Sequence, residues 1–183
     1  NLETKAGIKI LHLNLLANKV ASVRVDMGIP ILEGKNIPVA IDREKIINEP
    51  LTVAKQTLPM TCVSMGNPHA VFFVSEITDD LVLGLGPQIE KHPLFPRRTN
   101  VEFVKVINRH EIEMRVWERG AAITLACGTG SCATAVAGVL NGKTDRKVEV
   151  QLDGGKLIVE WAENGHVFMT GPAELVFTGE LTN

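Results

Sequence analysis

Cysteine, aromatic residues and net charge are all scarce in this sequence. Its 183 residues include 3 Cys, 6 Phe, 2 Trp and no Tyr, and the formal net charge is −2. Three cysteines are too few for a disulfide scaffold and suit a reducing compartment, so we expect a cytoplasmic protein. The near-balance of charge leaves no excess of basic residues to coat nucleic acid, and no nucleic-acid partner is expected.

Long apolar runs are missing as well. No stretch approaches the roughly 20 apolar residues of a membrane-spanning helix, so no membrane partner is expected. The chain starts at Asn1 without an initiator Met or the basic and apolar regions of a signal peptide, and we expect a piece of a longer protein. Hydrophobic residues make up 45% of the sequence, enough to bury a core.

Short strands dominate the pattern, because apolar and polar residues alternate in brief runs between Gly, Asn, Asp and Pro. The clearest hairpin covers 101–107 and 111–117, and another turns around Asn18. Short helical segments are predicted at 42–48 and 79–92. The other predicted strands are 60–65, 70–74, 148–152, 157–161, 167–170 and 175–178.

One predicted helix, 131–141, carries no charge on any face. A helix that is apolar all round must be buried on every side. Asn141 and Gly142 supply a left-handed stop. With strands before and after it, the helix predicts an α+β fold in which a curved, barrel-like mixed sheet wraps around a central apolar helix.

The start of this helix is the first candidate site. Its first N–H groups have no intrahelical partner, and the entry Gly128-Thr129-Gly130 brings no carboxylate, so a small anion such as a substrate carboxylate is expected there. The same positive helix end is expected to lower the pKa of Cys127 from about 8.5 towards about 3.5–7.5. Packing alone explains a small buried cysteine equally well.

A metal site is an alternative use of the same cysteines. Cys127 and Cys132 are spaced as Cys-x4-Cys, and Cys62 and His69 could complete four ligands. There is no second paired motif, so we expect no metal, and we expect Cys132 in the core.

Three further polar segments are weak signals when each is taken alone. Asn67 and His69 lie in a turn between two apolar strands, and Asn100 starts another strand. Glu118 and Arg119 end a half-buried strand, where a surface salt bridge would account for both.

Together these segments resemble the diaminopimelate epimerase family. The resemblance is carried by Gly-Asn-Pro-His at 66–69, Arg-Thr-Asn-Val-Glu-Phe at 98–103, Trp-Glu-Arg-Gly at 117–120 and Ala-Cys-Gly-Thr-Gly-Ser at 126–131. It implies two pseudosymmetric α/β lobes, each wrapping strands around a central helix. It also implies catalysis without pyridoxal phosphate or a metal, and therefore no cofactor.

The resemblance assigns roles by position. Cys127 corresponds to one of two catalytic cysteines, while Gly128 and Thr129 correspond to the helix end that holds the carboxylate of the reacting centre. His69 and Glu118 correspond to residues that influence protonation of the catalytic pair. The substrate contacts that it implies are Asn67, Asn100, Glu118 and Arg119.

The sequence departs from the family at the second catalytic cysteine. No motif like Cys-Gly-Asn-Gly precedes Gly66, and Cys62 is followed by Val63 and Ser64. We therefore expect residual strands of a truncated first lobe at 1–27, a second α/β lobe with the catalytic cysteine at 28–172, and a strand returning to the first lobe at 173–183. The missing N-terminal lobe is an expected partner, and a homodimer is possible.

The implied function is interconversion of LL- and meso-diaminopimelate by two-base (Cys/Cys) α-proton transfer, in lysine and peptidoglycan precursor biosynthesis. This chain would carry one of the two cysteines and be inactive alone. Three alternatives stay open. They are a non-catalytic small-anion binding module, a cysteine hydrolase with Cys127 as nucleophile and His69 as base, and a proline-racemase-like enzyme, which would not need Arg119.

Overall fold

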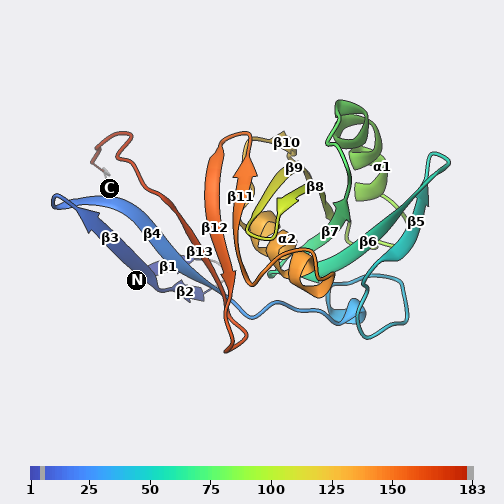
Figure 1. The fold of residues 1–183 in the computed structure, drawn as a ribbon, viewed down its shortest axis with the longest axis horizontal. Coiled ribbons are helices and arrows are strands. Elements are labelled where there is room, and N and C mark those ends of the chain that lie inside the picture. The colour runs from blue at the N-terminus through green and yellow to red at the C-terminus, as the bar shows by residue number, and fades with distance from the viewer. Residues whose placement is uncertain (5–6, 181–183) are drawn as a thin grey trace.

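One large curved sheet forms the frame of the molecule (Figure 1). The computed structural model describes residues 1–4 and 7–180, and eleven strands within these residues belong to the sheet. A short pair, β1 (Leu2–Thr4) and β2 (Gly7–Lys9), stands apart from it. The strands of the sheet are β3 (Leu11–Leu16), β4 (Lys19–Gly28), β5 (Glu49–Val53), β6 (Gln56–Ser64), β7 (Pro68–Phe73), β8 (Asn100–Asn108), β9 (Glu111–Glu118), β10 (Ala122–Thr124), β11 (Lys147–Leu152), β12 (Gly155–Trp161) and β13 (Val167–Pro172).

The strand order brings distant segments of the chain together. It runs β3-β4-β13-β12-β11-β9-β8-β7-β6-β5, with β10 paired to β9. The sheet therefore stays open, with β3 and β5 at its edges. The pairs β7–β8 and β9–β11 are parallel, whereas β8 and β9 are antiparallel. His69 is thus level with Asn100, and Val101 lies opposite Trp117. The starts of β7 and β8 and the end of β9 meet at one end of the sheet.

Helix α2 (Gly128–Leu140) lies within the curve of the sheet (Figure 1). Its residues from Gly130 to Gly138 are all buried. The helix packs among inward-facing side chains of the strands, including Val63, Val104 and Val150. Its small residues permit this close packing, and a Cβ on Gly138 would lie only 2.4 Å from Thr144 Oγ1.

A second apolar layer covers the opposite face of β6, β7 and β8. It contains the π-helix η2 (Asp80–Leu85), α1 (Gly86–Glu90) and the segment around the 3-10 helix η1 (Gly34–Asn36). Phe72 and Phe103 stack in this layer with ring centroids 5.7 Å apart. Both faces of these strands are therefore buried, which explains their nearly continuous apolar sequences.

The predicted α+β arrangement, with a curved sheet around one apolar helix, is confirmed. The predicted hairpins also form, and the β3–β4 turn places Ala17 and Asn18 at φ 49° and φ 60°. The central helix begins at Gly128, three residues before its predicted start, because Cys127 serves as the N-cap. Gly142 follows its end at φ 65°, the predicted left-handed stop.

Two predicted elements are wrong. Residues 42–48 form no helix, because backbone bonds tie this segment elsewhere: Glu33 bridges Lys45, and the Gly34 amide donates to the Glu44 carbonyl at 3.2 Å. Residues 175–178 form no strand, since no described strand lies beside them to pair with their backbone. Within the predicted segment 173–183, residues 181–183 lie outside the described residues, and its return to a first lobe stays a prediction.

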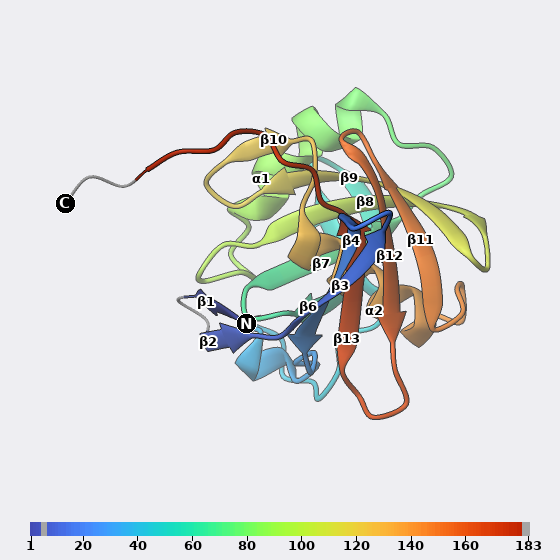
Figure 2. The same ribbon diagram turned by 90° about the vertical axis from the view of Figure 1, so that its left-hand side faces the viewer.

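The β3–β4 hairpin extends away from the main body (Figure 1), and so does the C-terminal stretch (Figure 2). β4 pairs with β13, so the hairpin is continuous with the main sheet. The assignment of 1–27 to a first lobe, and of 28–172 to a second, stays a prediction. Among the described residues, every helix is too short or too polar to cross a membrane.

Candidate active site

Cys127 lies at the N-terminus of the buried central helix. Its backbone is extended, with φ −137° and ψ 106°, and its Sγ accepts a hydrogen bond from the Gly130 amide at 3.3 Å. The Thr129 hydroxyl lies 3.6 Å from the same sulfur. Cys127 is 7% exposed. The thiol thus takes the capping role that a Ser or Asp side chain plays at other helices.

The first two amides of α2 are left for another acceptor. The Ser131 amide donates to the Cys127 carbonyl at 2.9 Å, and the Gly130 amide is taken by the sulfur. Within residues 1–4 and 7–180, no acceptor is bonded to the Gly128 or Thr129 amides, and both residues are partly exposed. Two outward N–H groups at a helix N-terminus suit a carboxylate, as the sequence predicts.

The predicted lowering of the Cys127 pKa is wrong for the structure described. Burial raises the pKa of the Cys127 thiol from its ordinary value of 9.0 to about 11, and the negative charges of Glu102 and Glu118 add to the rise. Hydrogen bonds from Thr129 and Gly130 act in the opposite direction but are weaker. Desolvation and two neighbouring acids therefore outweigh the helix terminus.

His69 is joined to the thiol by a chain of hydrogen bonds. Its Nε2 lies 3.1 Å from Asn67 Oδ1, and Asn67 Nδ2 donates to Thr129 Oγ1 at 3.3 Å. On its other side, His69 Nδ1 lies 2.6 Å from Glu102 Oε1, and both of these side chains are fully buried. This series of hydrogen bonds begins at Glu102 on β8, passes through His69 on β7 and Asn67 in the turn before β7, and ends at the start of α2.

Asn100, Glu118 and Arg119 meet at the same end of the sheet. Asn100 Nδ2 donates to the Pro68 carbonyl at 2.9 Å, and its Oδ1 accepts from the Arg119 amide at 2.8 Å. Glu118 accepts a hydrogen bond from the Thr124 hydroxyl. The salt bridge weighed for Glu118 and Arg119 is not formed, since neither takes part in an ion pair among the described residues. The Arg119 guanidinium is exposed and donates to a backbone carbonyl.

The structure therefore gathers the predicted residues at one place. The set consists of Asn67, His69, Asn100, Glu118, Arg119, Cys127, Gly128 and Thr129. Glu102 belongs with them but was not predicted as a site residue. The available signal was an acid inside the otherwise apolar run Val101 to Val104, on the strand that Asn100 starts.

The alternative metal set is not assembled. Cys62 packs in the outer apolar layer, whereas Cys127 and Cys132 pack with the central helix on the other face of the sheet. The pair required for a cysteine hydrolase is not in contact either. In the described part of the chain, His69 reaches Cys127 only through Asn67 and Thr129.

The fold is shared with solved structures of an epimerase and a probable racemase. A hydroxyproline epimerase from Agrobacterium vitis superposes with a TM-score of 0.64, covering 93% of this chain and 55% of that chain at 16% identity. A probable proline racemase from Agrobacterium radiobacter K84 gives a TM-score of 0.66, covering 93% and 56% at 16% identity. At such identities the likeness shows the fold alone.

Sequence comparison defines the family within this fold. The family model described as diaminopimelate epimerase matches residues 61–176, and the chain belongs to the diaminopimelate epimerase family. It is 56% identical over 180 residues to the diaminopimelate epimerase of Moorella thermoacetica and 55% identical over 181 residues to that of Acetivibrio thermocellus. These alignments cover 98% of this chain but only 64% and 65% of those proteins. The chain thus spans slightly less than two thirds of their length.

Proposed function

We propose that this chain carries one of the two proton-transfer faces of an enzyme that interconverts LL- and meso-diaminopimelate. The observation that carries the proposal is the Cys127 sulfur beside the unbonded amides of Gly128 and Thr129. Those amides would hold the carboxylate next to the α-carbon, and this binding would place the α-hydrogen beside the thiol. The names of the close relatives supply the substrate.

The reaction follows from this placement. In one direction, a Cys127 thiolate takes the α-proton, and the electron pair of the C–H bond delocalises into the carboxylate. In the other direction, the Cys127 thiol returns a proton to the carbanion from the same face. The Gly128 and Thr129 amides stabilise the charge that grows on the carboxylate oxygens. Inversion needs a second acid–base group on the opposite face, which we assign to the second cysteine of the family.

The raised pKa of Cys127 indicates that the thiol can act as the proton donor without any change in its surroundings. With its pKa raised to about 11, Cys127 is mainly a thiol at neutral pH. In the state described, Cys127 is therefore the acid of the pair. Its action as a base requires a change that favours the thiolate, such as proton uptake by one of the neighbouring acids.

The polar side chains around the thiol suit the distal end of diaminopimelate. Arg119 offers a guanidinium to the distal carboxylate, and Glu118 and Asn67 offer oxygen acceptors to the distal amine. Asn100 already uses its amide on Pro68, so it reaches the amine only through its Oδ1. A single-ended amino acid such as proline would leave Arg119 without a partner.

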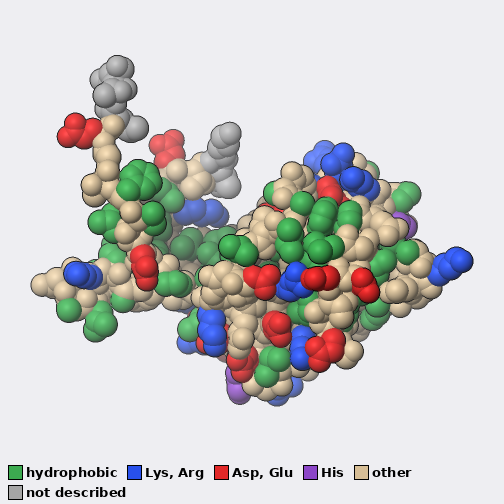
Figure 3. Space-filling model, turned by 90° about the horizontal axis from the view of Figure 1, so that it is seen from above, with side chains coloured by type: hydrophobic (Ala, Val, Ile, Leu, Met, Phe, Trp, Pro, Cys, Tyr) green, Lys and Arg blue, Asp and Glu red, His purple; other side chains and the backbone are tan. Residues whose placement is uncertain are grey.

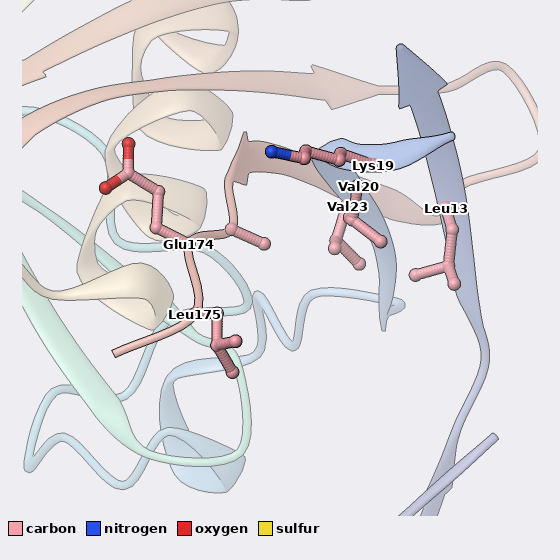
Figure 4. Close-up of a pocket in the computed structure, with 7 residues that line it drawn as sticks. Leu13, Lys19, Val20, Val23, Glu174 and Leu175 are labelled. Carbon is pink, nitrogen blue, oxygen red and sulfur yellow. The ribbon is translucent and has the colours of Figure 1, made fainter. Parts of the chain in front are cut away.

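We assign the acid–base group on the opposite face of the substrate to polypeptide outside these residues. An exposed apolar surface of this chain could bind that polypeptide. Exposed apolar side chains gather on the β3–β4 hairpin and on the C-terminal stretch (Figure 3). Between them is an open groove of about 730 Å³, with Leu13, Val20 and Val23 on one side and Leu175 on the other (Figure 4). Surfaces of this kind are unusual on an isolated domain. We assign their cover to an N-terminal lobe of the same enzyme.

The setting of this activity is part of the proposal. Interconversion of diaminopimelate isomers belongs to lysine and peptidoglycan precursor biosynthesis, which places the enzyme in the cytoplasm. No contact in the structure bears on a homodimer, which stays a prediction.

Hydrogen exchange at the α-carbon tests the function. LL-diaminopimelate is incubated in heavy water with this chain, with and without the N-terminal segment of the Moorella thermoacetica relative, and the label is read by NMR. We expect deuterium at the α-carbon and appearance of the meso isomer only in the complemented enzyme.

Three results would overturn the proposal in favour of an alternative. Binding of diaminopimelate without exchange points to an anion-binding module, and exchange on proline but not on diaminopimelate points to a proline racemase. Acylation of Cys127 by an activated ester, followed by turnover, points to a hydrolase.

A further inference from the structure

Glu102 is a buried acid to which the proposed reaction gives no direct role. It lies on β8 with 0% exposure, and its Oε1 is 2.6 Å from Nδ1 of the equally buried His69. A Cβ added to Gly130 would lie 2.9 Å from the same oxygen and 3.1 Å from Cys127 Sγ. The carboxyl group therefore packs against the first turn of α2, beside the sulfur.

The hydrogen bonds between Glu102 and the sulfur have one consistent direction. Asn67 presents its carbonyl oxygen to His69 Nε2, so Nε2 must carry a proton. Asn67 presents its amide to Thr129 Oγ1, which therefore accepts. The Thr129 hydroxyl hydrogen is then free to point at the sulfur, 3.6 Å away. In this series of hydrogen bonds, each group donates to the next one towards Cys127.

This direction requires a proton between Glu102 and His69. With a proton on Nε2, a neutral imidazole has a bare Nδ1, and a carboxylate cannot donate to it. Either Glu102 is a carboxylic acid that donates to Nδ1, or His69 is an imidazolium that donates to Glu102. Burial raises the pKa of Glu102, although the nearby His69 opposes the rise. In both arrangements the pair holds one shared proton and carries no net charge.

The other titratable groups near the pair are known. Glu118 on β9 raises the pKa of Glu102 by its charge, and the Glu102 charge in turn raises the pKa values of Cys127 and of Cys62 on β6. A proton on Glu102 removes one of the charges that oppose the Cys127 thiolate. The shared proton therefore favours the thiolate in two ways: it offsets the Glu102 charge, and it fixes the direction of the donors.

We propose that Glu102 is a positioning residue whose proton, shared with His69 Nδ1, holds the Asn67 and Thr129 donors towards the Cys127 sulfur. Its part in catalysis rests on the proposed function, but its effect on the thiol does not. Glu102 touches no reacting atom and acts through His69.

Two substitutions test this role through the reactivity of the thiol. Glu102→Gln keeps a donor that can face Nδ1, whereas Glu102→Met fills a similar volume and donates nothing. Iodoacetamide labelling of Cys127 is followed from pH 7 to 10, and mass spectrometry identifies the labelled peptide. We expect Glu102→Gln to react within about twofold of the parent chain, and Glu102→Met to react about tenfold more slowly at pH 8.

The direction of the change separates this role from two others. If Glu102 acted only as a buried negative charge, both variants would react faster than the parent chain. If its role were only structural, Glu102→Gln and Glu102→Met would lower thermal stability without separating in labelling rate. Either result would overturn the proposal.

A measurement on the unsubstituted chain covers the case in which Glu102→Met does not fold. Nitrogen-15 NMR of labelled histidine reports which ring nitrogen of His69 carries a proton, with His69→Gln identifying its signals. We expect a protonated Nε2 at pH 7, and a bare Nε2 would contradict the proposal. Neither readout depends on turnover, so failure of exchange on diaminopimelate would leave this result standing.

Discussion

At the residue scale, the close packing around Cys127 leaves no room for a side chain at Gly130. A Cβ there would lie 2.9 Å from Glu102 Oε1 and 3.1 Å from Cys127 Sγ. We expect Gly130→Ala to lower the free energy of unfolding by about 1–3 kcal/mol, the cost of overpacking a core. We also expect it to reduce diaminopimelate exchange in the complemented enzyme at least tenfold. Urea unfolding and heavy-water NMR measure the two effects.

Gly84 provides the matched control for this substitution. A Cβ at Gly84 would meet nothing within 4 Å, and the residue is exposed. Gly84→Ala should therefore leave both quantities nearly unchanged. Equal losses of stability and exchange from the two substitutions would mean that close packing at Gly130 is not their cause.

Alkaline pH should destabilise the chain through its buried thiols. The pKa of Cys127 is raised from 9.0 to about 11 and that of Cys132 to about 12. Between pH 9 and these values the unfolded thiols ionise while the folded ones do not. The unfolded state then binds fewer protons, so stability falls with rising pH by up to about 1.4 kcal/mol per pH unit for each thiol.

Substitution of Cys127 tests that assignment. Urea unfolding of the parent chain and of Cys127→Ala is compared at pH 8, 9 and 10. The variant should show the shallower loss of stability above pH 9. Parallel losses in the two proteins would show that Cys127 ionises equally easily in the folded and unfolded states.

At this scale, the sequence predicted contacts between residues that are close together in the chain. Cys127 and Thr129 are two residues apart at a helix start, so their proximity is local. Glu102 and His69 are 33 residues apart, and only the parallel pairing of β7 with β8 brings them together. The pKa of Cys127 was mispredicted for the same reason, since the burial that raises it most and the acids that add to the rise depend on other strands.

At the element scale, the central helix depends on small residues where it meets its surroundings. A Cβ at Gly138 would lie 2.4 Å from Thr144 Oγ1. Replacing Gly by Ala favours a helix by up to about 1 kcal/mol, but overpacking costs about 1–3 kcal/mol. We therefore expect Gly138→Ala to destabilise the chain in urea unfolding.

Thr144 allows this explanation to be checked. Its hydroxyl is buried and has no hydrogen-bond partner among the described residues, so Thr144→Ala should cost little. The double variant Gly138→Ala/Thr144→Ala should recover most of the stability lost by Gly138→Ala. If the two losses simply add, the clash with Thr144 is not their cause.

Elements with a clear local pattern of apolar and polar residues were predicted correctly. Elements whose conformation depends on contacts with distant residues were not. The alternation of Ile112, Met114 and Val116 with polar residues marks β9 as half-buried, as the structure confirms. Segment 42–48 has no such pattern, and its conformation is fixed by pairing with Glu33 and Gly34. The N-cap of α2 is the thiol of Cys127. Because Ser, Thr, Asp and Asn are the usual N-cap residues, the sequence alone did not indicate a helix start at this cysteine.

At the scale of the whole molecule, the apolar hairpin and C-terminal stretch are the expected contact with the opposing lobe. Phe177 is 81% exposed, so Phe177→Ser should change the stability of the chain alone by less than about 0.5 kcal/mol. It should weaken complementation by the N-terminal segment at least tenfold, measured as the concentration of segment needed for half-maximal exchange.

Ile107 is the control for this surface. It is 48% exposed at the end of β8, and it belongs to neither the β3–β4 hairpin nor the C-terminal stretch. Ile107→Ser should leave complementation unchanged. If it weakens complementation as strongly as Phe177→Ser does, the N-terminal segment does not dock at the proposed surface.

Exchange of the α-hydrogen by the complemented enzyme, with and without the Cys127 sulfur, tests the central claim most directly. Cys127→Ala and Cys132→Ala are compared for deuterium incorporation into LL- and meso-diaminopimelate in heavy water. The account predicts that Cys127→Ala abolishes interconversion of the isomers, whereas Cys132→Ala keeps it and loses only about 1 kcal/mol of stability through packing. Interconversion at the parent rate by Cys127→Ala would contradict it.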